Sequence, residues 1–176
     1  VFIIFIAHAG LAMRKFPSSY QQYRVFLTHR KQLKHSDTSL WLIQAITGFA
    51  MFFLGTAHLY TMLTHSADIG PFASADRVWS GGSWLLDILL LLAVEFHGGI
   101  GLYRLAVKWG WFDGDNPRRN RIRLKRFMWG MIGFLLLLGT MSLAAYMKIG
   151  QAHAEHVGER YSPAELQQPI IHGEQQ

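Results

Sequence analysis

The chain has 176 residues, of which 51% are hydrophobic and 14% aromatic, and its formal net charge is +6 at pH 7. It contains no cysteine, which excludes disulfides, thiolate-bound iron–sulfur clusters, a thiol nucleophile and the thioether attachment of c-type haem. The apolar residues are gathered into long runs, which favours a membrane protein over a soluble globular domain.

The sequence starts at Val1 with an apolar run and shows neither an initiating Met nor the basic segment of a signal peptide. We interpret residues 1–13 as the end of a spanning helix, so that upstream sequence is expected to be missing. Three complete spans follow at about residues 39–64, 83–105 and 127–147, each with the roughly 20 apolar residues that a membrane helix needs. The predicted fold is an all-α transmembrane bundle of three complete spans and a partial N-terminal one.

Charge is distributed unevenly between these spans. Residues 14–38 and 104–126 are strongly basic, whereas residues 65–82 and the C-terminal tail are not. The positive-inside rule therefore places the two basic stretches in the cytoplasm and the other two outside. The basic stretches could also bind an acidic partner or anionic lipid. We predict a membrane domain over residues 1–150 and a flexible periplasmic tail over residues 151–176.

Three of the nine histidines, His8, His58 and His97, lie inside apolar spans, where an ionisable side chain is costly and usually faces the bundle interior. At 1.5 Å rise per residue, His8 lies roughly 10 Å and His97 roughly 16 Å from the cytoplasmic boundary. Imidazoles from two helices at similar depth can bind one haem iron from opposite faces. His58 belongs to the outer half and has no such partner in this chain. The alternative for each histidine is an interhelical hydrogen bond.

Several neighbouring residues fit a haem site. Small residues near the histidines would let a flat macrocycle approach, or would serve close helix packing; they are Gly10, Gly55, Gly98, Gly99 and Gly101. Glu95 is a candidate for proton transfer or for a structural hydrogen bond. Trp41 and Lys108, and less so Arg104, lie at the depth of the propionates of an inner haem, and Arg77 could serve an outer one. Most residues of this kind are interface anchors.

At these positions the sequence resembles the di-haem cytochrome b subunit of quinol:fumarate reductases of the epsilonproteobacterial type. The resemblance is carried by residues 8–17, 41–60 and 94–113, and covers most of residues 1–150. It implies five helices and two b haems, with His8 and His97 binding the haem iron nearer the cytoplasm and His58 binding the outer one. The second outer ligand and the quinol-site carboxylate would lie upstream, and Glu95 matches a membrane glutamate proposed to carry protons.

The resemblance further implies a flavoprotein and an iron–sulfur subunit on the cytoplasmic side of the bacterial inner membrane. Electrons would pass from menaquinol through the haems to these subunits, where fumarate is reduced, and the reverse direction is chemically available. The chain would then be the flavin-free subunit of an oxidoreductase complex. Two alternatives remain: the di-haem anchor of another complex, such as a hydrogenase or formate dehydrogenase, and a non-redox transporter or scaffold.

Overall fold

The computed structural model describes residues 2–14, 16–33, 36–66 and 69–159. Throughout this described part the regular structure is helical and strands are absent. In chain order the elements are α1 (Phe2–Met13), α2 (Tyr20–Leu33), α3 (Ser36–Thr64), α4 (Pro71–Trp79), α5 (Trp84–Lys108), α6 (Pro117–Ala152) and the short 3₁₀ helix η2 (Ala154–His156). The predicted all-α fold is confirmed.

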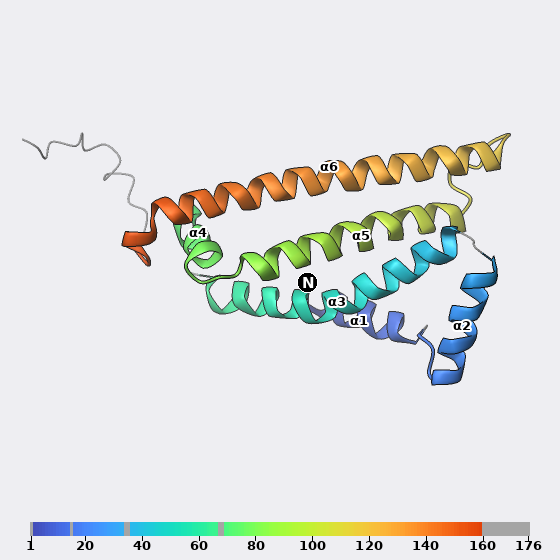
Figure 1. The fold of residues 1–176 in the computed structure, drawn as a ribbon, viewed down its shortest axis with the longest axis horizontal. Coiled ribbons are helices and arrows are strands. Elements are labelled where there is room, and N and C mark those ends of the chain that lie inside the picture. The colour runs from blue at the N-terminus through green and yellow to red at the C-terminus, as the bar shows by residue number, and fades with distance from the viewer. Residues whose placement is uncertain (1, 15, 34–35, 67–68, 160–176) are drawn as a thin grey trace, which may run out of the picture.

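Three long helices run side by side, with α5 between α3 and α6 (Figure 1). The short helix α1 lies along α3, whereas α2 and α4 sit at opposite ends of the bundle (Figure 1). All three long helices are long and apolar enough to cross a membrane. The 36 residues of α6 span about 54 Å, well beyond a hydrocarbon core of about 30 Å. This helix therefore projects into the aqueous phase.

The buried core is small and centred on α5. Its buried members come from α3, α5 and α6 and are Leu40, Ile100, Tyr103, Met128 and Ile132. Gly99 allows the close contact of α5 with α6, because a Cβ atom there would collide with the Ile132 side chain. Most other apolar side chains of the long helices are exposed, as expected for surfaces that face lipid rather than water.

The ends of the spans differ from the prediction. The stretches between the predicted spans are partly helical, because residues 14–38 contain α2 and residues 65–82 contain α4. Helix α5 ends three residues after the predicted span and α6 begins ten residues before the next one, so only residues 109–116 of the basic stretch 104–126 connect the two helices. A hydropathy pattern marks only the part of a helix inside lipid, whereas backbone hydrogen bonding continues into water. Asn116 starts α6 by accepting a hydrogen bond from the Arg119 amide at 3.1 Å, with Pro117 as the first helical residue.

One polar cluster ties the long helices together at the basic end. The Asp37 carboxylate accepts a hydrogen bond of 3.1 Å from the Tyr103 hydroxyl and pairs with the Lys125 ammonium. Lys125 also donates to the Ser36 hydroxyl at 2.8 Å. Because these residues come from α3, α5 and α6, the cluster fixes the relative positions of three helices.

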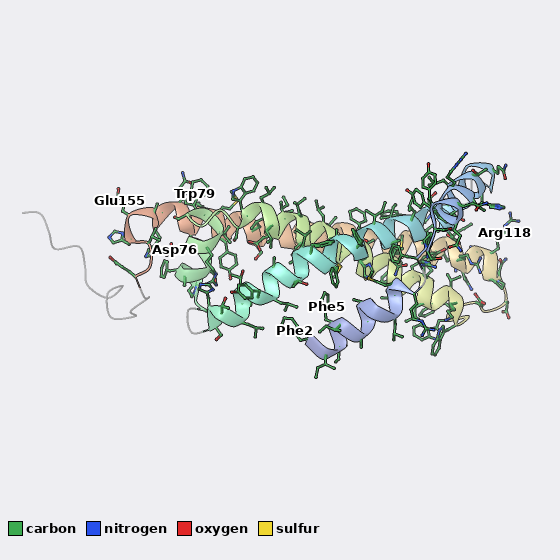
Figure 2. The ribbon with its side chains drawn as sticks, turned by 90° about the horizontal axis from the view of Figure 1, so that it is seen from below. Phe2, Phe5, Asp76, Trp79, Arg118 and Glu155 are labelled. Atoms are coloured by element: carbon green, nitrogen blue, oxygen red, sulfur yellow. The ribbon has the colours of Figure 1, made fainter. Side chains whose placement is uncertain are left out.

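A second polar cluster holds α4 against the far end of α6. Asp76 is buried, lies 3.1 Å from Nδ1 of His153 and accepts a hydrogen bond from the Gly158 amide. Gly150 faces the Ala75 carbonyl so closely that a Cβ atom would collide with it. Figure 2 shows the labelled Asp76, Trp79 and Glu155 at this end, and Arg118 at the opposite one. Within the predicted tail, α6 and η2 continue the helical structure to His156, and residues 160–176 lie outside the described residues.

Candidate functional site

The structure brings His8 of α1 and His97 of α5 together. Their ring centroids are 6.2 Å apart and the ring planes are almost perpendicular, at 88°. Phe5 of α1 also stacks on Phe52 of α3, with ring centroids 6.4 Å apart (Figure 2 labels Phe5). Two imidazoles from helices far apart in sequence thus face one another at one level of the bundle.

The His97 ring is held in a defined orientation. Its Nδ1 lies 2.9 Å from the backbone carbonyl oxygen of Gln44 on α3. A carbonyl oxygen can only accept, so Nδ1 must carry the proton of this hydrogen bond, and in the neutral ring Nε2 keeps its lone pair. Metal-binding histidines are commonly oriented in this way, through the ring nitrogen that does not bind the metal.

Gly48 makes this approach possible. A Cβ atom at Gly48 would lie 2.7 Å from Cε1 and 2.9 Å from Nδ1 of His97, closer than real Cβ contacts come. Only glycine therefore lets the imidazole reach the Gln44 carbonyl, one turn earlier on the same face of α3.

His8 differs from His97 in having an exposed side chain. Within the part of the chain that the structure describes, its imidazole makes no hydrogen bond, and its ring contact is with His97. Both of its nitrogens are therefore available to a ligand. The histidine pair therefore consists of His97, whose ring is held by a hydrogen bond, and His8, whose ring is not held by one within the described residues.

The spacing of the two rings can be compared with the needs of a bound metal. A metal–imidazole nitrogen bond is about 2 Å long, so imidazoles on opposite sides of one ion have centres roughly 6 Å apart. The 6.2 Å between the centres of the His8 and His97 rings matches this value. The perpendicular ring planes are also compatible with a shared metal, because an imidazole can rotate about its bond to a metal. The described residues contain no group of three or more His, Asp or Glu suited to a bare ion. Two imidazoles instead suit haem, in which the porphyrin supplies the other four ligands.

His58 does not join this pair. It lies ten residues beyond Gly48 on α3, or about 15 Å along the helix. Its Nδ1 is 3.7 Å from Oδ1 of Asp87 in the first turn of α5. That distance is too long for a hydrogen bond, but places a carboxylate beside the ring. Asp87 itself accepts a hydrogen bond of 2.8 Å from the Ser83 hydroxyl.

The other predicted site residues are dispersed. Glu95 is partly buried on α5, two residues before His97, and so points to another side of the helix. The Trp41 ring packs against Phe26 of α2 with centroids 4.7 Å apart. Lys108 is the exposed last residue of α5. Arg77 is on α4 and donates to the Ser74 hydroxyl at 3.1 Å.

Sequence reasoning missed Gln44, which links two candidate residues. Its backbone oxygen binds His97, and its side-chain Oε1 accepts a hydrogen bond from the Arg104 guanidinium. Arg104 lies within α5, at the end of the predicted span 83–105. It is seven residues from His97, which is two helical turns on the same face. The sequence feature that could have pointed to Gln44 is a polar glutamine within an apolar span, since such residues usually form hydrogen bonds between membrane helices.

The fold and these histidines define a class: a membrane-spanning helical protein with imidazoles paired between its helices. Comparison with known proteins gives the family. Residues 21–140 match the model for the succinate dehydrogenase/fumarate reductase transmembrane subunit. The chain is 56% identical over 150 residues to the fumarate reductase cytochrome b subunit of Wolinella succinogenes, covering 85% of this chain and 59% of the relative. It is 51% identical over 156 residues to the subunit of the same name in Helicobacter pylori, covering 89% and 60%.

A more distant relative is the succinate dehydrogenase hydrophobic membrane anchor subunit of Archaeoglobus fulgidus, 45% identical over 64 residues, which are 35% of this chain and 54% of that protein. This chain belongs to the succinate dehydrogenase/fumarate reductase transmembrane subunit family. The resemblance predicted from the sequence is thereby confirmed. The chain spans about three fifths of the length of the cytochrome b relatives that it matches.

Proposed function

We propose that this chain is the haem-bearing membrane part of a fumarate reductase cytochrome b subunit, in which His8 and His97 would hold the iron of the haem nearer the cytoplasm. The observation that carries the proposal is the facing pair of imidazoles, 6.2 Å apart, with His97 oriented by the Gln44 carbonyl. When bound, haem b supplies one-electron transfer, and two histidine ligands leave no position open for oxygen chemistry.

In this proposal the chain's own residues set the properties of the site. Gln44 holds the His97 tautomer with Nε2 free, and Gly48 provides the space for that ring. The hydrogen bond to a carbonyl also makes the imidazole a stronger base and hence a better ligand. His97 does make the interhelical hydrogen bond of the structural alternative, but that bond uses Nδ1 alone.

His58 is proposed as one ligand of a second, outer haem. Its neighbour Asp87 would orient the ring by attracting the Nδ1 proton. Within the described residues His58 has no contact with a second imidazole, so the other ligand of that haem must come from elsewhere in the complete subunit.

Polar residues around the pair complete the proposal. Lys108, Arg104 and Trp41 lie toward the basic end of the bundle and are proposed to face the propionates of the inner haem. Arg77 is proposed for the outer haem. Glu95 is proposed to carry protons through the membrane alongside electron transfer, because a partly buried carboxyl on a spanning helix can exchange a proton with its surroundings.

The complete subunit is proposed to take electrons from menaquinol and to pass them to an iron–sulfur subunit and a flavoprotein. The family supports this assignment, since its relatives are named as subunits of fumarate reductase and succinate dehydrogenase. The basic end of the bundle would face these partners in the cytoplasm, with the protein in the bacterial inner membrane. Fumarate reduction and succinate oxidation are both compatible with this arrangement.

The test is a haem count on the purified full-length complex. Substitution His97→Ala should remove one of two b haems, seen as loss of about half of the Soret absorbance. The matched control is His29→Ala, an exposed histidine of α2, which should leave both haems. A complex without haem, or one in which His97→Ala keeps both, would contradict the proposal. Copurification with a hydrogenase or formate dehydrogenase instead of a flavoprotein would reassign the complex.

A further inference from the structure

A second site lies on the opposite side of α5 from the histidines. A cavity of about 800 Å³ opens between α5, α6 and the connection between them. Leu102 and Ala106 line it, five and nine residues after His97, which places them roughly 140° and 180° around the helix from that histidine. The cavity is therefore separate from the candidate haem site and does not depend on the proposed function.

The cavity is a groove that runs along the helices. Its lining on α6 extends from Asn120 to Met131, eleven residues or about 16 Å along the helix axis. In a spanning helix this direction is close to the membrane normal, so the groove passes from the headgroup level into the hydrocarbon level. Leu102 and Phe127 line its walls and are 50% and 67% exposed. An occupant must therefore be long, apolar over most of its length, and able to enter from the bilayer.

The aqueous end of the groove is polar and cationic. The Asn120 amide is engaged with the Asp113 carbonyl at 3.0 Å, and the Tyr103 hydroxyl donates to Asp37. Arg123 lines the groove, is exposed, and makes no hydrogen bond or ion pair within the described part of the chain. The charged group that remains for an occupant is thus a guanidinium, whose fork of N–H donors suits a phosphate.

We propose that this groove binds an anionic phospholipid, with one acyl chain along the apolar walls and the phosphate at Arg123. A lipid matches both the direction of the groove and the charge at its mouth, as in other basic pockets between membrane helices. A quinone would fit the walls but carries no negative charge for Arg123. A soluble protein could cover the mouth but could not reach the hydrocarbon level.

The test is lipid retention by the full-length complex, measured by native mass spectrometry with phosphatidylglycerol or phosphatidylcholine. The wild type should retain phosphatidylglycerol in preference to phosphatidylcholine. Arg123→Gln should lower phosphatidylglycerol retention roughly 5-fold, the factor expected for one cationic side chain near anionic lipid. Phosphatidylcholine retention should fall less, because choline already offsets the charge of its phosphate. The matched control is Arg118→Gln, which removes the same charge one to two turns earlier on α6 and outside the groove. An unchanged melting temperature would show that the variants fold.

A companion variant tests the apolar wall. Phe127→Ala should lower retention of the anionic lipid without changing the net charge. The proposal fails if Arg118→Gln weakens phosphatidylglycerol binding as much as Arg123→Gln does, since binding would then reflect the basic surface as a whole. It also fails if menaquinone displaces the lipid, which would assign the groove to quinone, or if retention depends on the soluble subunits, which would make it a subunit interface.

Discussion

Gly48→Ala is the most direct test of how the His97 imidazole is held. The new methyl carbon would lie 2.7 Å from Cε1 and 2.9 Å from Nδ1 of that ring, so the ring must move away from α3. Moving it stretches the 2.9 Å hydrogen bond to the Gln44 carbonyl. Overpacking of this kind costs about 1–3 kcal/mol. That cost corresponds to a roughly 5- to 150-fold lower affinity of the imidazole for the group that it binds.

The assay is the rate at which the purified complex loses haem to an excess of a haem-scavenging protein. We expect one of the two haems to leave roughly 5- to 150-fold faster in Gly48→Ala than in the wild type, and the other to leave at its original rate. Gly133→Ala is the matched control, because a Cβ atom at this position of α6 has no atom within 4 Å. Equal rates in Gly48→Ala and Gly133→Ala would refute the reasoning, since the imidazole would then not depend on the space at Gly48.

Three further perturbations test the rest of the structure. Asp37→Asn weakens the cluster that joins α3, α5 and α6 and should lower the free energy of unfolding by about 1–3 kcal/mol. Thermal melting of the complex should show this loss, and the control Asp115→Asn, in the exposed connection between α5 and α6, should melt like the wild type. Gly150→Ala forces a methyl group against the Ala75 carbonyl and should release α4 from α6, so that a protease cleaves faster within residues 65–82. Cleavage at the wild-type rate would show that α4 is held in another way. Glu95→Gln should retain both haems and slow menaquinol-dependent turnover about 100-fold or more, as expected for loss of a positioned proton-transfer group; unaltered turnover would leave this carboxyl a structural role only.

The amino-acid sequence by itself determined the class of fold and the positions of the spans. Each predicted complete span coincides with one long helix of the structure, apart from Ser83, which precedes the first residue of α5. A run of about 20 apolar residues in lipid must satisfy its backbone hydrogen bonds internally, and a helix does so. The same reasoning placed His8 and His97 at similar depth, since rise per residue in a helix is constant. These properties are local or follow from chain length, so they can be read from one sequence.

Only the tertiary structure decided which atoms meet. The helix α4 escaped prediction because its partners, Gly150 and His153, lie some 75 residues further along the chain. The roles of Gln44 and Gly48 escaped it for the same reason, since both depend on the rotation of α3 about its own axis relative to α5. Hydropathy fixes the depth of a residue in the membrane but not the angle at which its helix presents it. That angle is set by the packing of small and large side chains between helices, and it determines which imidazole nitrogen remains free to bind a metal.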